Sequence, residues 1–242
     1  MSVDYLLLIL LFLVILFVLS RALNIFDLRG SIAAFIVGFF VAVLGSLQWL
    51  ILMIVFAAVS HVATISFMKQ KKKISMQEGK EGERKTSNVV YAALIGLGIA
   101  IIHFIHPVQV PYFTLFAVSF AVIASDTFAS EIGILDKKVF MITTFRRTTR
   151  GINGGISLVG QFAALLGSFI ISITYSLLRH GDLDPLPIFA IGIMGFIGCQ
   201  IDSVLGAAFE NRGKLTKGEV NLLASLTAVI ATGLIIIFYP GV

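Results

Sequence analysis

Two aspartates lie inside apolar stretches that are long enough to form membrane helices. Asp126 falls within the run 111–135, and Asp202 falls within the run 187–209. A carboxylate in the middle of a bilayer costs about 2.5–3.5 kcal/mol on insertion scales, so such residues usually face a protein interior and have a function. Each aspartate is followed by a hydroxyl residue, two apolar residues and a small residue. This recurrence makes the pair the first candidates for chemistry.

The two aspartates are expected to lie at the same depth. With a helical rise of 1.5 Å per residue, each is about 21–23 Å from the outer end of its span. Two carboxylates at one level suit Mg²⁺, which proteins typically hold with one or two carboxylates plus phosphate oxygens and water. Glu131 is a weaker candidate for the same role. The alternative is a pair of aspartates that only form hydrogen bonds between helices or are neutralised by a buried arginine.

The composition indicates an integral membrane protein. Hydrophobic residues make up 58% of the 242 residues and charged residues 13%, whereas soluble domains carry about 25% charged residues. The mean hydropathy is +1.01. We therefore predict an all-α, polytopic transmembrane helix bundle that forms a single domain over 1–242. The lone Cys199 excludes an internal disulfide and a cysteine-based zinc site, and we expect no nucleic-acid partner.

Hydropathy and helix-breaking residues predict about eight membrane spans. They are 3–20, 31–47, 48–67, 88–105, 112–133, 156–178, 187–207 and 219–239. With the N-terminus placed outside, Arg179 is the only one of the 18 lysines and arginines that lies on the outer side. The positive-inside rule thus predicts that both termini are outside and that the active site faces the cytoplasm. Spans five and seven run in the same direction and carry their aspartates at one level, which suggests an internal repeat of spans five and six in spans seven and eight.

The inner loop 136–155 has features of a phosphate site. It contains three arginines and ends in a glycine-rich segment that leads directly into span six; the residues concerned are Arg146, Arg147, Arg150, Gly151, Asn153, Gly154 and Gly155. Glycine-rich backbone at a helix N-terminus presents free N–H groups to an anion, and arginine forks suit phosphate. Glycine turns often only connect helices, and topology alone explains the arginines. Together with the nearby aspartates, however, they favour phosphate handling.

The ordered set of motifs resembles a known membrane family. The motifs are EGERKTSNVVYA (81–92), SDTFASEIG (125–133), GINGGIS (151–157), GFIGCQIDSVLGAAFE (195–210) and GEVNLL (218–223). They are similar to those of the transmembrane protein 19 family, which includes phytyl-phosphate kinases and is distantly related to CTP-dependent phytol and dolichol kinases. One departure is the start of the glycine loop, where Arg150-Gly151-Ile152 stands in place of a Pro-Gly-Thr type sequence.

The resemblance implies transfer of a terminal phosphate from a nucleoside triphosphate, CTP, to an isoprenyl monophosphate such as phytyl or geranylgeranyl phosphate. Mg²⁺ would be held by Asp126 and Asp202. Phosphates would be held by the backbone of 151–155 and by basic side chains; these are Arg84, Lys85, Arg146, Arg147 and Arg150. Polar support would come from Asn88, Ser130, Ser203 and Asn221.

Other functions remain open at this point. A polyprenol kinase would need a general base for its alcohol acceptor, for which Glu131 is the available residue. A nucleotidyltransferase acting on a lipid phosphate and an ion-coupled transporter are further alternatives. The expected partners are the isoprenyl phosphate, the nucleotide and membrane lipids, with a homodimer as an additional possibility.

Overall fold

The computed structural model describes residues 3–79, 82–84, 86–108 and 110–238. Within them the chain forms eight apolar helices: α1 (Val3–Ala22), α2 (Leu28–Leu44), α3 (Leu47–Ile65), α5 (Thr86–Ile105), α6 (Tyr112–Gly133), α7 (Leu158–His180), α8 (Pro185–Ala208) and α9 (Lys217–Phe238). Seven of these described helices are long and apolar enough to cross a membrane. The exception, α2, has 17 residues, near the lower limit of about 17 for a span. The predicted all-α polytopic fold is confirmed.

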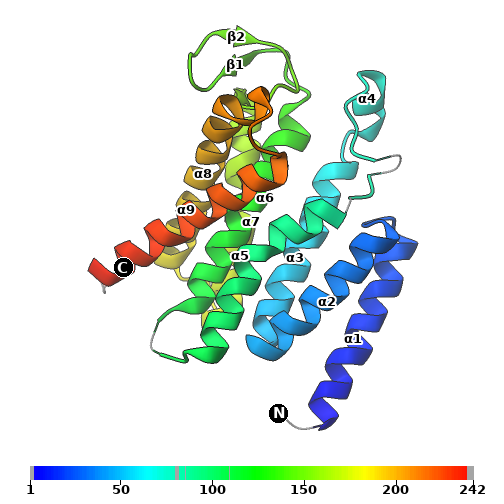
Figure 1. The fold of residues 1–242 in the computed structure, drawn as a ribbon, viewed down its shortest axis with the longest axis vertical. Helices are drawn as coiled ribbons and strands as arrows, with labels where there is room; N and C mark the ends of the chain where they lie inside the picture. Colours follow the sequence, from blue (N-terminus) through cyan, green and yellow to red (C-terminus); the bar gives the residue numbers. More distant parts are fainter. Residues whose placement is uncertain (1–2, 80–81, 85, 109, 239–242) are drawn as a thin grey trace.

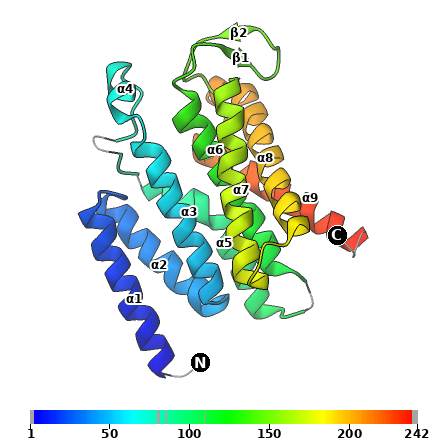
Figure 2. The ribbon, with the colours of Figure 1, turned by 180° about the vertical axis from the view of Figure 1, so that it is seen from behind.

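Helix α6 forms the centre of the bundle. It packs against α3, α5, α7, α8 and α9, and Figures 1 and 2 show these helices arranged around it while α9 crosses the bundle obliquely. Small residues such as Ala117, Ala121 and Ala124 are fully buried along α6. Without a hydrophobic driving force between helices in lipid, such small residues allow the close backbone approach that gives dispersion contacts.

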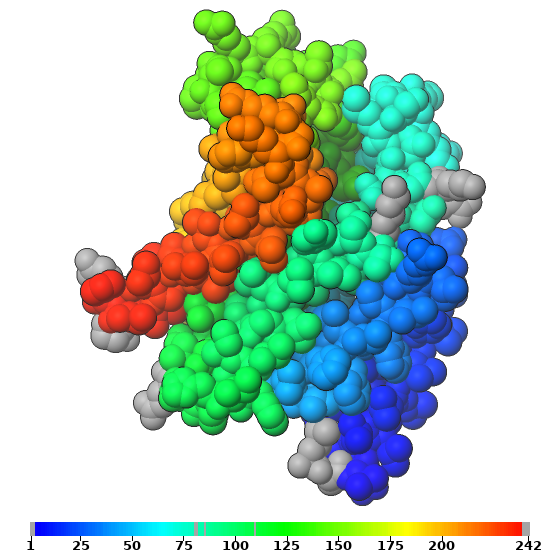
Figure 3. All heavy atoms as spheres, viewed as in Figure 1, coloured from blue at the N-terminus to red at the C-terminus, as the bar shows by residue number. Residues whose placement is uncertain are grey.

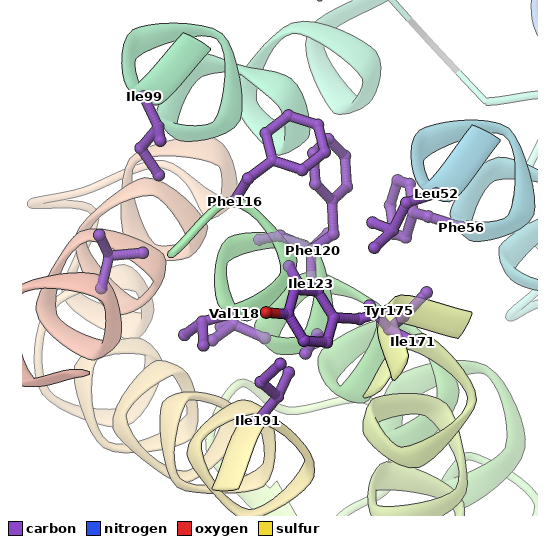
Figure 4. Packing of buried hydrophobic residues seen from close by; sticks show 14 of the residues in the cluster. Leu52, Phe56, Ile99, Phe116, Val118, Phe120, Ile123, Ile171, Tyr175 and Ile191 are labelled. Atoms are coloured by element: carbon purple, nitrogen blue, oxygen red, sulfur yellow. The ribbon is translucent and has the colours of Figure 1, made fainter. Parts of the chain in front are cut away.

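The half of α6 that precedes Asp126 is sealed by a hydrophobic core. Phe116, Phe120 and Ile123 are at most 2% exposed, and Phe120 packs against Phe56 of α3 in a tilted arrangement with ring centroids 5.0 Å apart. Figure 4 shows these side chains converging around α6. Polar chemistry on α6 is therefore confined to its C-terminal half.

Glycines on α8 bring that helix into direct contact with α6. A Cβ added to Gly195 would lie 2.7 Å from the Ala121 Cβ, and one added to Gly198 would collide with the Val122 side chain. Contacts this short are not tolerated without displacement of the neighbouring helix. The glycine spacing on α8 thus serves close helix packing.

A short helix that the sequence did not predict, α4 (Met68–Lys73), interrupts the expected loop 68–87. The basic run 71–73 predicts a topology signal and a contact with anionic lipid head groups, and for Lys71 the head-group contact is wrong. Its side chain is fully buried, and its Nζ donates to the carbonyls of Ala63 and Thr64, at 3.1 and 2.8 Å, and to Glu131 Oε2 at 2.6 Å. Lys71 thus caps the free carbonyls of α3 and pairs with α6.

The expected loop 136–155 contains a small antiparallel sheet with strand order β2-β1-β3. Its strands are β1 (Val139–Met141), β2 (Arg147–Thr148) and β3 (Gly155–Ile156). The expectation that the glycine loop leads directly into a helix is corrected, because β3 comes first and α7 starts only at Leu158. Ser157 caps α7, since its Oγ accepts a hydrogen bond of 3.1 Å from the N–H of Gly160.

The connections segregate to two ends of the molecule. Figure 1 shows α4 and the β1–β2 hairpin at one end and the α2–α3 and α5–α6 connections at the other. Asp126 and Asp202 both lie in the parts of α6 and α8 that run toward the hairpin end. The assignment of this end to the cytoplasm, with both termini outside, stays a prediction from charge, as does the internal repeat.

Replacing Gly198 with alanine should destabilise the bundle by about 1–3 kcal/mol, because the added methyl overpacks the contact with Val122. Thermal unfolding in detergent measures the change. The control is Gly233→Ala on α9, where a Cβ would meet nothing within 4 Å. That variant should be neutral or stabilised by up to about 1 kcal/mol, and equal melting temperatures for the two variants would contradict the packing argument.

The predicted orientation can be tested with two exposed positions at opposite ends, Thr143 in the hairpin and Asp182 between α7 and α8. In intact cells, Asp182→Cys should react with a membrane-impermeant maleimide, whereas Thr143→Cys should react only after permeabilisation. The unmodified chain, whose single Cys199 is buried, supplies the background. Labelling in the reverse pattern would refute the cytoplasmic placement of the hairpin end.

Candidate active site

A polar cavity of about 330 Å³ opens at the hairpin end of the bundle. Asp126 on α6 and Asp202 on α8 both line it, together with the glycine loop and the start of α9. Figure 3 shows the surface hollowed here, between the orange residues of the α8–α9 connection and the cyan residues of α4. The structure therefore brings the two sequence-predicted aspartates to one site.

The physical reason for this meeting is helix register. Val122 and Gly198 are in contact where α6 and α8 touch, and Asp126 and Asp202 each follow four residues later. Residues four apart lie on the same face of a helix. Because α6 and α8 are parallel, the aspartates emerge side by side one turn beyond the contact.

The Asp202 carboxylate is buried and incompletely satisfied. Its residue is 9% exposed, and Oδ2 has no hydrogen-bond partner among the described residues. Asp126 is partly buried and lies within electrostatic range of Asp202. An ionised oxygen buried without a partner is costly, so this arrangement favours a bound cation or a proton between the two groups.

Two charged residues at the site were missed by sequence reasoning. Lys217, the first residue of α9, and Glu210 line the same cavity, and Lys217 lies within electrostatic range of both aspartates. Lys217 was counted only as a topology signal. Two signals in the sequence could have identified these residues. Lys217 directly precedes the motif GEVNLL, and Glu210 ends the motif on α8.

The glycine loop forms one wall of the cavity. Gly151, Asn153, Gly154 and Gly155 all line it. Gly154 has a φ of +77°, and a Cβ there would lie 2.6 Å from the carbonyl oxygen of Ser203. Only glycine combines this left-handed conformation with such close contact to α8. The loop backbone is therefore held against the helix that carries Asp202.

The structure separates the three arginines that sequence analysis grouped together. Arg150 lines the cavity. Arg146 and Arg147 are exposed in the hairpin and do not belong to the cavity lining. Arg150 is thus the member of the group that can meet a bound anion without movement of the hairpin.

Glu131 lines the cavity, but its carboxylate is already engaged. Lys71 Nζ lies 2.6 Å from Oε2, and Thr64 Oγ1 donates to Oε1 over 3.2 Å. A role as general base or metal ligand would require this buried ion pair to open. Ser130 and Ser203 also line the cavity, where Ser130 Oγ donates to the carbonyl of Thr127.

Arg84 and Asn88 line a neighbouring apolar cavity instead. Asn88 Nδ2 donates to Glu78 Oε1 at 3.0 Å, and Glu78 lines the polar cavity, so the two spaces adjoin. Burial lowers the pKa of the Arg84 guanidinium, while the charges of nearby carboxylates, Glu131 first, act in the opposite direction. Arginine is not deprotonated in proteins, so the guanidinium keeps its charge.

Of the two remaining predicted residues, the structure describes one. Lys85 is outside the described residues. Asn221 on α9 has a buried Oδ1 without a partner among the described residues, and it belongs to neither of the two cavity linings.

The polar cavity carries an excess of negative charge. Five carboxylates and two basic side chains line it; the carboxylates are Glu78, Asp126, Glu131, Asp202 and Glu210, and the basic residues are Arg150 and Lys217. Since Lys71 neutralises Glu131, about two negative charges remain when all groups are ionised. No cluster of three or more His, Cys, Asp or Glu side chains suited to a metal occurs in the described part of the chain.

Comparison with known proteins places the chain in a family. A family model described as integral membrane protein DUF92 matches residues 11–236. The chain is 33% identical over 207 residues to uncharacterized membrane protein MJ0933 of Methanocaldococcus jannaschii, which covers 84% of this chain and 83% of that protein. It is 32% identical over 203 residues to membrane protein sll0875 of Synechocystis, covering 80% and 76% respectively.

A plant relative is also found. The chain is 28% identical over 235 residues to protein VTE6, chloroplastic, of Arabidopsis thaliana, covering 90% of this chain and 68% of that protein. No solved structure matches the chain. These matches confirm the resemblance that the motifs predicted, and the chain belongs to the DUF92 family of integral membrane proteins.

Proposed function

We propose that this protein is a membrane kinase that transfers the terminal phosphate of a nucleoside triphosphate, CTP, to an isoprenyl monophosphate such as phytyl or geranylgeranyl phosphate. At the level of the family, the similarity to VTE6 over 90% of the chain supports an isoprenoid-related membrane kinase. The observation that carries the proposal is the meeting of Asp126 and Asp202, from two helices, in a cavity walled by a glycine loop.

The residues fit a magnesium ion that arrives with the nucleotide. The unpartnered Oδ2 of Asp202 and the excess negative charge of the cavity both favour a divalent cation. Magnesium commonly takes one or two carboxylates and completes its octahedral shell with phosphate oxygens and water, so the lack of a third ligand fits this metal. When bound, Mg²⁺ would neutralise charge on the phosphate oxygens.

The reaction needs no strong base. An oxygen of the acceptor monophosphate forms a bond to the terminal phosphorus of the nucleotide, and the bond from that phosphorus to the bridging oxygen breaks, releasing the nucleoside diphosphate. A phosphate acceptor is already ionised at neutral pH, whereas an alcohol would profit from a general base. The engagement of Glu131 by Lys71 therefore favours the phosphate acceptor over the alcohol.

The chain's contribution is positioning and charge. Phosphoryl transfer depends mainly on placing the groups in line and stabilising their charge. Arg150 and the 151–155 backbone would donate to the nucleotide phosphates, with Ser130 and Ser203 as polar support. Lys217 lies within range of both aspartates and would limit their repulsion before the cation binds.

A nucleotide screen tests the function directly. Purified protein with Mg²⁺ is incubated with CTP, ATP, GTP or UTP and with isoprenols or isoprenyl monophosphates. The masses of the lipid products are then measured by mass spectrometry. The expected product is the monophosphate plus one phosphate. A gain of CMP would identify a nucleotidyltransferase, and a phosphorylated isoprenol would identify an alcohol kinase. If no nucleotide is consumed, the kinase proposal is refuted.

Asp126→Asn and Asp202→Asn should each lower kcat by at least about a hundredfold, because each removes a charge that holds the cation at the transferred phosphate. Both proteins should stay folded, as measured by thermal unfolding. Asp182→Asn, at an exposed position in the opposite connection, is the matched control and should keep full activity. A fully active Asp126 or Asp202 variant would remove that residue from the metal site.

Arg150→Ala should raise KM for the nucleotide about tenfold through loss of a charge-assisted hydrogen bond to phosphate, while Arg147→Ala should change it less than about twofold. Steady-state kinetics over a range of nucleotide concentrations measures both. The two residues belong to one loop but differ in access to the cavity. A larger effect at Arg147 would show instead that the hairpin closes over the site.

A further inference from the structure

A second cavity, of about 250 Å³, lies beside the polar one and differs from it in chemistry. Residues of α1, α2, α3, α5 and α6 line it, and their side chains are almost all apolar. Representative members are Leu13, Phe17, Phe35, Met53, Ala57 and Phe120. Such a lining suits a hydrocarbon chain and gives no reason for water or ions to enter.

One end of this apolar cavity is basic. Arg84 and Asn88 line it, and the buried Arg84 Nε has no hydrogen-bond partner among the described residues. Among the residues that the structure describes, this guanidinium makes one side-chain hydrogen bond, from Nη2 to Thr64 Oγ1 at a long 3.4 Å. A buried guanidinium with an unused donor favours an anionic partner.

The basic end adjoins the polar cavity. Thr64 Oγ1, which accepts from Arg84, in turn donates to Glu131, and Asn88 is bonded to Glu78. Glu131 and Glu78 both line the polar cavity. An anionic head group at Arg84 would therefore lie at the boundary of the space that Asp126 and Asp202 share.

The other side of the apolar cavity leads toward lipid. A separate apolar hollow of about 270 Å³ between α1 and α2 is lined by Val14, Phe17, Ile32 and Phe35. Phe17 and Phe35 also line the apolar cavity, so the cavity and the hollow share these two side chains. Val14 and Ile32 are 49% and 46% exposed on the outer surface, where lipid chains would contact them.

We propose that the apolar cavity holds the hydrocarbon chain of the isoprenyl phosphate acceptor, with its phosphate at Arg84 and its tail leaving between α1 and α2. The assignment rests on the proposed function for the identity of the lipid. The volume agrees with partial enclosure, because about 250 Å³ is below the roughly 300–1,000 Å³ of sites that bury a whole ligand. The remainder of the chain occupies the hollow beyond Phe17 and Phe35.

The test is photolabelling without nucleotide. Protein in lipid nanodiscs is incubated with an isoprenyl phosphate that carries a diazirine on its chain, and labelled residues are mapped by peptide mass spectrometry. The expected labels fall on Phe17, Phe35 and Met53. Ala34→Phe, which fills the cavity, should reduce labelling about tenfold, whereas the same change at the neighbouring Ala33, outside the lining, should leave it unchanged.

Further variants guard against misfolding. Ala57→Phe fills the cavity from α3 and should reproduce the loss, with melting temperatures measured for every variant. Arg84→Gln should lower the ratio of isoprenyl phosphate labelling to isoprenol labelling about tenfold, because it removes the charge that meets the phosphate. An unchanged ratio would overturn the head-group assignment.

The outcomes separate this inference from the proposed function. Labels that map to the outer faces of α7 or α9, that persist in both filled variants, or that are abolished by excess ordinary phospholipid would overturn the chain site even in an active kinase. Labels in the cavity of a protein that makes no diphosphate would support the lipid site while refuting the kinase.

Discussion

The site depends on the close approach of α8 to α6. Gly195 and Gly198 allow the two helices to touch at Ala121 and Val122, and this contact fixes their relative height. Because the helices are parallel, the next turn of each carries its aspartate to the same place. A larger side chain at the contact would separate the helices and move the two carboxylates apart. The same constraint extends to the loop, since Gly154 rests against the backbone of Ser203 on α8.

The buried Lys71–Glu131 pair is completed within the protein, whereas Asp202 keeps a buried oxygen without a hydrogen-bond partner among the described residues. Lys71 satisfies two carbonyls of α3 and the carboxylate of Glu131 together, which offsets the cost of burying both charges. Within the part of the chain that the structure describes, Asp202 has no such partner for its Oδ2. A structural pair would be completed within the protein, whereas this incomplete pair favours an exchangeable cation. This difference separates the role of Glu131 from that of the aspartates.

The two cavities match the two kinds of group that a lipid kinase must bring together. One is lined by carboxylates, glycine backbone and Arg150, and the other by aliphatic and aromatic side chains. The two cavities adjoin where Arg84, Thr64 and Asn88 make hydrogen bonds that link the two linings. In the proposed reaction the nucleotide stays on the aqueous side and the hydrocarbon on the lipid side, and only the phosphates cross this boundary. The enzyme then has no need to extract the acceptor completely from the membrane.

Much of the fold could be predicted from the sequence, because hydrocarbon imposes a simple rule. A segment that crosses lipid must satisfy its backbone internally and be apolar for about 20 residues. The predicted spans therefore agree with the helices to within a few residues, and the two aspartates stood out as exceptions to the rule. The small sheet and α4 were missed because they lie outside the apolar runs. In such segments local hydrogen bonding, and not hydropathy, determines the secondary structure.

Sequence alone determined the class of protein and its helices. It also marked Asp126 and Asp202 as candidates, since carboxylates violate the expectation for an apolar span, and Gly154, since it belongs to a glycine-rich loop. Only the tertiary structure decided which polar residues share a space. It assigned Lys71 to Glu131, brought Lys217 to the aspartates, and set Arg150 apart from Arg147. Such pairings join segments far apart in the chain, and no periodicity within one helix specifies which face of a distant helix it will meet.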